Sequence, residues 1–220
     1  MVPIKENLVP KDKYAIKCPY TRTPTRVVIH NTANDAPAAN EISYMRYNDL
    51  EISFHYAVDD VNIVQGIPEN RNAWASGDGH GKGNMEGIHI EICYSKSGGK
   101  KFDKAEQNAA EFTASLLKKY GWGIDKVTKH RDYDGKYCPH RTLDRGWQRF
   151  LSMVKRYMEP AKAPVASKFT PYLIRKNCRD ALNIRKGPST NYGILGQIKD
   201  TLRYTIVEER SVSLICPKMP

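Results

Sequence analysis

A segment rich in proline, alanine and lysine, EPAKAPVASKFTP at residues 159–171, separates two unequal parts of this 220-residue chain. It has no sustained helical or strand period, which is typical of a linker. A chain of this length favours one domain of ordinary size and a smaller one. We therefore predict a principal domain over residues 1–158, a linker over 159–170 and a second domain over 171–220.

The principal domain alternates short strand patterns with longer helical ones. This order is typical of an α/β fold, in which helices flank a central mixed β-sheet. The expected strands are residues 26–30, 54–58, 62–65 and 87–93, and residues 127–130 form a further strand-like run.

The best-marked helix follows residue 102. Asp103 is placed to cap its N-terminus, with Glu106 three residues later, and Gly121 marks its end. Its expected apolar face consists of Ala105, Ala109, Phe112 and Leu116.

Two further helices are expected in the principal domain. One begins near Asp35, has Pro37 in its first turn and ends at about Asp49. The other covers residues 144–158 and has an apolar stripe that we interpret as core. The stripe consists of Trp147, Phe150, Leu151, Val154 and Met158.

The second domain contains short β-type runs separated by turn residues such as GPSTNYG, which predicts a small all-β barrel. It is also strongly basic, since residues 161–220 hold 11 of the 35 Lys and Arg residues but only 4 of the 24 Asp and Glu residues. Such a field concentrates anionic partners and also aids solubility. The domain lacks the interleaved aromatic and basic residues of nucleic-acid-binding modules, so we do not expect nucleic acid as a partner.

Composition excludes several classes of protein. No apolar run approaches the roughly 18 residues that span a membrane, so no membrane partner is expected. The N-terminal segment MVPIKENLVPKDKY never builds the apolar core of a secretory signal, and we expect no export by that route. The five cysteines are scattered and form no CxxC pair, which is typical of a reducing compartment.

The strand GIHIEIC, residues 87–93, carries a candidate catalytic carboxylate. Side chains alternate between the two faces of a strand, so the three isoleucines share one face and His89, Glu91 and Cys93 share the other. Glu91 is therefore fixed opposite the main apolar layer. A single strand glutamate is more often a solvated charge, so this assignment depends on other residues.

Those other residues lie in HRDYDGKYCPH, residues 130–140. His130 and Cys138 are separated by a turn and can converge on one ion. Zinc accepts imidazole and thiolate, and a catalytic zinc site uses three protein ligands. His30, which ends an apolar strand, is the best candidate for the third ligand. The pattern alone leaves His55 and His140 open as ligands or as partners of the ligands.

Other chemistries are less well supported. Cys138 acting as a nucleophile with a histidine base fits the residue types, but we rank it behind metal ligation. The chain contains neither HExxH nor GxSxG. The segment SGDGHGKGN, residues 76–84, does not satisfy the phosphate-binding GxxxxGK[ST] pattern, and we interpret it as a mobile loop bordering the site.

Four segments together resemble a known family. VVIHNTA, FHYAV, GIHIEIC and KHRDYDGKYCPHRTL, in this order within residues 24–158, are similar to the zinc-dependent N-acetylmuramoyl-L-alanine amidases of phage endolysins and bacterial autolysins. That family shares its fold with the peptidoglycan-recognition proteins. Some relatives carry a catalytic tyrosine where this chain has Phe54.

The resemblance implies a division of roles among five residues. His30, His130 and Cys138 would bind one Zn²⁺, Glu91 would act as the catalytic base, and Lys136 would stand beside the site and stabilise an oxyanion. The implied reaction is hydrolysis, through a zinc-activated water, of the amide between the lactyl group of N-acetylmuramic acid and L-alanine. The competing interpretation is a non-catalytic peptidoglycan-binding protein of the same fold.

The second domain resembles bacterial SH3-type wall-binding domains through ALNIRKGPSTNYGILGQI. The tryptophan usual in the later strands of that family is missing, which is typical of a truncated domain. The expected partners are peptidoglycan of Gram-positive bacteria and, through the basic domain, anionic wall polymers. We expect the protein to stay in the cytoplasm of the host cell until lysis and then to act on the cell wall.

Overall fold

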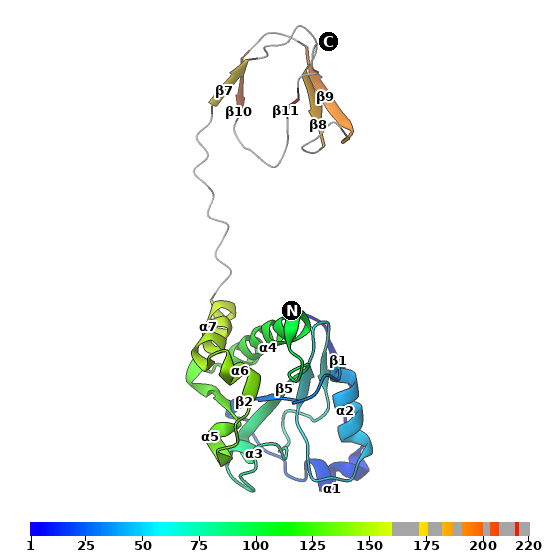
Figure 1. Ribbon diagram of the computed structural model, residues 1–220, viewed down its shortest axis with the longest axis vertical. Helices are drawn as coiled ribbons and strands as arrows, with labels where there is room; N and C mark the ends of the chain where they lie inside the picture. Colours follow the sequence, from blue (N-terminus) through cyan, green and yellow to red (C-terminus); the bar gives the residue numbers. More distant parts are fainter. Residues whose placement is uncertain (160–171, 176–181, 187–190, 200–202, 207–213, 216–220) are drawn as a thin grey trace. The chain divides into compact units, whose positions relative to one another are not determined.

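The computed structural model describes residues 1–159, 172–175, 182–186, 191–199, 203–206 and 214–215 (Figure 1). The chain divides into two compact units, Met1–Ala161 and Lys162–Pro220. Apart from Glu159, the predicted linker lies outside the described residues, as do parts of the predicted C-terminal strands.

The first unit is built on a six-stranded mixed sheet, which confirms the predicted α/β class. The strand order is β1-β4-β3-β5-β2-β6; only the β3–β4 pair is antiparallel, and the other neighbours are parallel. The strands are β1 (Ile4–Glu6), β2 (Arg26–Asn31), β3 (Tyr56–Val58), β4 (Ile63–Gln65), β5 (Gly87–Ile92) and β6 (Val127–Lys129).

Helices flank this sheet. Figure 1 shows α4 and α7 side by side, and α4 packs on β3 and β5. No helix in the described part of the chain is long and apolar enough to cross a membrane. The α-helices are α1 (Tyr14–Lys17), α2 (Ala38–Tyr47), α3 (Lys82–Glu86), α4 (Gly99–Tyr120), α5 (Arg131–Asp134), α6 (His140–Asp144) and α7 (Trp147–Met158), and the 3-10 turns are η1 (Lys11–Lys13) and η2 (Ile124–Lys126).

One face of β5 packs in the core and the other carries Glu91, as the alternation of its side chains predicts. Ile88, Ile90 and Ile92 are fully buried in the core with apolar side chains of α4. Glu91 is in register with His30 of the parallel strand β2. Paired residues of neighbouring parallel strands point to the same side of a sheet. Glu91 and His30 therefore share the face of the sheet opposite the three isoleucines.

The start of α4 differs from the prediction. The helix begins at Gly99, so Asp103 is not its N-cap and Glu106 does not complete a capping box. Phe102, which is fully buried, lies in the first turn, and its burial extends the helix toward the N-terminus. The predicted end is confirmed: Gly121 has φ 68° and donates its N–H to Leu117 and Lys118 carbonyls.

The other two predicted helices are confirmed with shifted ends. Pro37 is extended and precedes α2 rather than lying in its first turn, and Asp59 accepts the N–H of Ala38 at 3.0 Å. Asn48 returns to extended geometry, so α2 ends two residues before Asp49. The predicted helix over residues 144–158 begins three residues later, as α7, because Gly146, at φ 99°, separates it from α6, which ends at Asp144.

Glu106 stabilises the α4–α7 contact instead of capping α4. Its buried carboxylate accepts two hydrogen bonds from Arg149, at 2.6 and 2.7 Å, and one from Arg145 at 3.2 Å. Glu106→Ala is expected to lower the free energy of unfolding by about 2 kcal/mol, because hydrogen bonds to a charged group contribute about 1.5–3 kcal/mol and both arginines keep access to water. Chemical denaturation measures this loss.

Asp103→Ala is the matched control for that prediction. Its carboxylate pairs with the same Arg145 at 2.8 Å but is 53% exposed. Removing an exposed ion pair should change the free energy of unfolding by less than about 1 kcal/mol. Equal losses in the two variants would contradict the role given to Glu106.

The described part of the second unit contains only short strands. They form a two-stranded antiparallel sheet, β10-β7, and a three-stranded one, β11-β8-β9. This agrees with the predicted all-β composition. The strands are β7 (Tyr172–Arg175), β8 (Leu182–Arg185), β9 (Ile194–Ile198), β10 (Arg203–Ile206) and β11 (Leu214–Ile215).

Candidate active site

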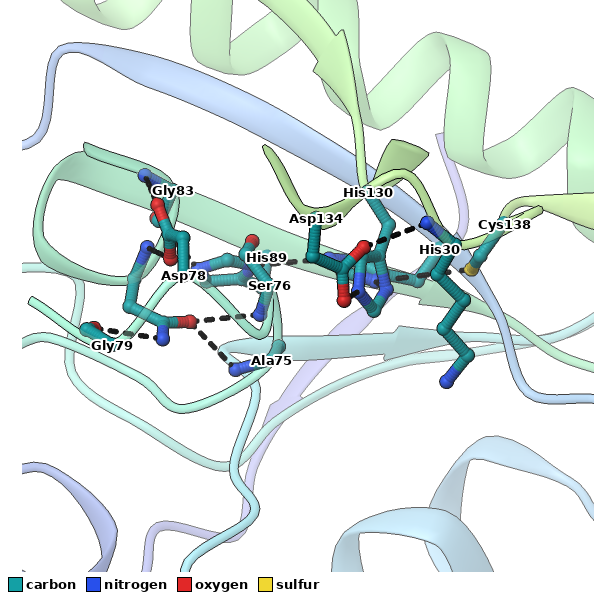
Figure 2. Close-up of polar contacts among 12 residues, drawn as sticks. His30, Ala75, Ser76, Asp78, Gly79, Gly83, His89, His130, Asp134 and Cys138 are labelled. Atoms are coloured by element: carbon teal, nitrogen blue, oxygen red, sulfur yellow. Dashed lines mark hydrogen bonds and ion pairs between the residues drawn. The ribbon is translucent and has the colours of Figure 1, made fainter. Parts of the chain in front are cut away.

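Three buried side chains far apart in the sequence converge at one edge of the sheet (Figure 2). His30 Nδ1 lies 3.1 Å from His130 Nδ1 and 4.0 Å from Cys138 Sγ. All three ligand atoms lie within 4.8 Å of one another, so the group could hold a metal ion. The structure thus brings together His130, Cys138 and the preferred third candidate, His30, which are the three metal ligands that the family resemblance implies.

The fold explains this convergence. β2 and β6 are parallel neighbours, so His30 near the end of β2 and His130 directly after β6 emerge at the same edge. The N–H of His130 donates to Ile29 of β2 at 3.3 Å. Cys138 returns to the same place because its carbonyl accepts the N–H of Arg131 at 3.0 Å, which closes the loop around α5.

Hydrogen bonds assign the tautomers of both imidazoles. His130 Nε2 donates to the Asp134 carboxylate at 3.0 Å, and His30 Nε2 donates to His89 Nδ1 at 2.9 Å. Burial, with smaller contributions from neighbouring positive groups, lowers the pKa of His30 well below its usual range, and burial also lowers the pKa of His130. Both rings are therefore neutral near pH 7, with the Nδ1 lone pairs free to bind a cation.

This donor set fits a zinc ion. Two Nδ1 acceptors 3.1 Å apart repel each other unless a cation lies between them. Tetrahedral zinc, with Zn–N near 2.0–2.1 Å and Zn–S near 2.3 Å, separates its ligand atoms by about 3.3–3.6 Å, which lies between the 3.1 Å of the His30–His130 pair and the 4.0 Å of the His30–Cys138 pair. Burial, with a smaller effect of Glu91, raises the pKa of the Cys138 thiol to about 12. A free nucleophilic thiolate is therefore disfavoured, whereas a bound cation deprotonates the thiol directly.

Glu91 lines the same cleft, and one of its two carboxylate oxygens has no hydrogen-bond partner among the described residues. Its Oε2 atom is buried and accepts no hydrogen bond from the described residues. Burial raises the pKa of Glu91 to about 8; the nearby Glu41 carboxylate adds to this and Lys136 opposes it. A carboxyl group with a pKa near neutrality can accept a proton and return it.

The cleft in front of these residues has a volume of about 1110 Å³. Lys136 lines it and is solvent-exposed, and its N–H donates to Asp134 at 2.8 Å. Asp134 thus contacts both a metal-ligand candidate and the backbone of Lys136. Phe54, at the position where some relatives carry tyrosine, also lines the cleft.

The two histidines left open by the sequence pattern are not in the ligand group. His55 is buried away from the cleft lining, where its Nδ1 accepts the N–H of His89 at 3.0 Å and its Nε2 donates to Arg71 O at 2.9 Å. His140 lines the cleft, but its ring binds the carbonyl of Ser95 at 3.2 Å.

Sequence reasoning missed the residues that hold the two imidazoles. Side-chain alternation in β5 predicts that His89 lies on the same face as Glu91, and this was the available indication that His89 is near the site. Asp134 lies in the segment between His130 and Cys138 that the sequence predicts as a turn, although its spacing of four residues from His130 is the i, i+4 spacing of one helical turn.

The segment at residues 76–84 does border the site, since Gly77, Gly79 and His80 line the cleft. It is not simply a loop, because residues from Lys82 onward form α3. Asp78 accepts the N–H groups of Gly83 at 2.7 Å and Asn84 at 3.1 Å, and these short-range bonds fix the start of the helix.

Comparison with known proteins decides the family. The family model described as N-acetylmuramoyl-L-alanine amidase matches residues 20–141, more than half of the chain. The chain belongs to this amidase family. Its matched region contains His30, Glu91, His130 and Cys138.

Curated relatives are similar over most of the chain. It is 51% identical to the N-acetylmuramoyl-L-alanine amidase XlyB of Bacillus subtilis (strain 168) over 181 residues, which cover 80% of this chain and 57% of XlyB. It is 50% identical to the amidase CwlA of the same organism over 190 residues, covering 82% of this chain and 70% of CwlA. XlyB therefore extends well beyond the matched region.

Solved structures agree with the amidase fold. The structure of PlyL is 53% identical in sequence with a TM-score of 0.68, and the match covers 69% of this chain and 96% of that one. The solution structure of the PlyG catalytic domain is 51% identical with a TM-score of 0.68, covering 73% of this chain and 98% of that domain.

Proposed function

We propose that this amidase-family chain is a zinc-dependent peptidoglycan hydrolase that cleaves the amide between the lactyl group of N-acetylmuramic acid and L-alanine. The observation that carries the proposal is the buried group of His30, His130 and Cys138 at the base of a cleft that also contains Glu91. The similarity to XlyB and CwlA supports the choice of bond.

His30 and His130 would hold zinc through Nδ1 and Cys138 through Sγ. Zinc in this site would supply Lewis-acid polarisation of a carbonyl and a lowered pKa for water. Two neutral imidazoles and one thiolate leave a net charge near +1 at the site, so the cation keeps much of this power.

Glu91 would move the proton. Its unpartnered, buried Oε2 can accept a proton from the attacking water and deliver it to the leaving amine of L-alanine. The raised pKa of Glu91 fits both halves of this task, because a carboxylate of ordinary pKa returns a proton less readily near pH 7. The cleft that Glu91 lines would hold the peptide stem.

Lys136 would stabilise the developing oxyanion. Its side chain lines the cleft, and its positive charge acts on His30, Glu91 and Cys138. Lys136→Ala is expected to lower kcat by about 10²-fold to 10³-fold, the usual cost of removing one oxyanion donor, with a smaller effect on KM. Steady-state kinetics on purified walls measures both.

Lys126→Ala is the matched control for Lys136, because it removes one positive charge from an exposed lysine outside the cleft lining. Its kcat should stay close to that of the original protein. An equal loss in both variants would assign the effect of Lys136 to net charge.

The zinc assignment has a direct test. Protein purified without chelator should contain about one zinc ion per chain, and its wall-clearing activity should be lost on chelation and restored by zinc. Full activity of metal-free protein would refute the proposed mechanism.

We further propose that the second unit is a bacterial SH3-type module that binds anionic wall polymers, and that the protein reaches the wall from the host cytoplasm at lysis. The proposed wall-binding role of the second unit is supported by the basic composition of that unit, its short antiparallel strands and the motif around residues 181–198. A chain ending at residue 161 should therefore bind walls more weakly than the full chain. Equal sedimentation with walls would remove this role.

A further inference from the structure

A hydrogen-bonded path leads from the metal-ligand group into the first turn of α3 (Figure 2). His30 Nε2 lies 2.9 Å from His89 Nδ1, and His89 Nε2 lies 3.0 Å from the carbonyl oxygen of Gly83. Both imidazoles are buried, with 1% and 0% exposure. Water therefore does not compete for these bonds.

The path has only one consistent arrangement of protons. A carbonyl oxygen only accepts, so His89 Nε2 must carry a hydrogen and donate it to Gly83. Among the described residues, the fully buried His89 hydrogen-bonds through its ring only to His30 and the Gly83 carbonyl, with no carboxylate to balance a positive charge, so the ring is neutral and its Nδ1 has a free lone pair. His30 Nε2 must then be the donor, which leaves the lone pair of His30 Nδ1 directed at His130 and Cys138.

The Gly83 end of this path is fixed by close packing. A β-carbon at Gly83 would lie 2.6 Å from Ser76 Cβ and 2.8 Å from a ring carbon of Tyr133, so α3 approaches both closely. Asp78 also accepts the Gly83 N–H. The Gly83 carbonyl is therefore a rigid acceptor, and His89 transmits its position to His30.

We propose that His89 is a positioning residue that holds His30 in the tautomer and orientation that bind the metal. The inference rests on the proposed zinc site and extends it to a residue outside the ligand group. An outer partner of a metal-binding histidine fixes the tautomer and the ring orientation, and its loss typically weakens metal affinity by about 10-fold to 100-fold.

Two substitutions separate the two bonds of His89. Asparagine places an amide oxygen one bond beyond Cγ, as His Nδ1 is, so His89→Asn keeps an acceptor for His30 and loses the bond to Gly83. Glutamine places an amide nitrogen at the level of His Nε2, so His89→Gln keeps a donor for Gly83 and loses the acceptor for His30.

A third variant, His55→Gln, is the matched control. His55 is an equally buried histidine whose ring stacks on that of His89, with centroids 5.6 Å apart, yet its polar contacts are with Arg22, Arg71 and the His89 backbone. Its substitution therefore disturbs the same interior without removing a partner of a metal-binding ring.

The experiment measures zinc dissociation constants of the full chain and the three variants by competition with a chromophoric chelator, with thermal unfolding in parallel. His89→Gln should bind zinc about 10-fold to 100-fold more weakly, while His89→Asn and His55→Gln should stay within about threefold of the original protein. Zinc bound by His89→Gln as tightly as by the original protein would overturn the inference, as would equal weakening in His55→Gln. If the original protein bound no zinc, the proposed metal site itself would fail.

Discussion

Replacing Cys138 with alanine is expected to abolish zinc binding at stoichiometric levels and to lower amidase activity by about 10³-fold or more. Metal ions contribute several kcal/mol of transition-state stabilisation, and each 1.4 kcal/mol is about tenfold in rate. Among the described residues, the metal-ligand group consists of His30, His130 and Cys138, so the loss of the Cys138 thiol leaves two imidazoles. Elemental analysis and a wall-clearing assay measure the two effects.

Cys18→Ala is the matched control, because Cys18 is also a buried free thiol but does not line the cleft. It should keep about one zinc per chain and most of the activity. If Cys138→Ala kept its zinc and its activity, the assignment of the metal site would be wrong, and loss of zinc from both variants would point to general destabilisation.

Replacing Glu91 with glutamine should separate metal binding from proton transfer. Glutamine keeps the shape of the side chain but cannot accept the proton, so zinc affinity should be retained while kcat falls by about 10²-fold to 10⁴-fold, the usual contribution of general acid–base catalysis. Titration with zinc and single-turnover kinetics on a soluble muropeptide measure the two quantities. Full activity of this variant would remove Glu91 from the mechanism.

Glu41→Gln is the comparison for Glu91, since burial raises the pKa of Glu91 most and the Glu41 carboxylate adds to that rise. Removing its negative charge should lower the pKa of Glu91, because the ionised form of Glu91 is then repelled less. The acidic limb of the pH–rate profile should therefore move to lower pH, with far less loss of kcat than in Glu91→Gln. A shift to higher pH would contradict the electrostatic account of this pair.

The metal-ligand group could be predicted from the sequence because its two histidines stand at recognisable positions in the strand pattern. His30 and His130 each follow a short apolar strand, and parallel strands bring their ends to one edge. Alternation in β5 correctly separated the isoleucine face from the face of Glu91. Family resemblance then selected His30 over His55 and His140, which the pattern alone had left open.

Other features carried no usable local signal. The residues of β1 are all exposed and do not alternate in polarity, so this edge strand is defined only by its pairing with β4. The start of α4 depends on the burial of Phe102, a tertiary contact. Likewise, Glu106 matched a capping pattern although its partners, Arg145 and Arg149, lie about forty residues away.

The central claim is that the cleft above His30, His130 and Cys138 hydrolyses the bond between N-acetylmuramic acid and L-alanine. Mass spectrometry of purified peptidoglycan digested with the full chain tests it most directly, with Glu91→Gln digested in parallel. The account predicts peptides with a new free L-alanine amine, no new reducing sugar ends and almost no products from the variant. New reducing ends, or cleavage at another peptide bond, would contradict it.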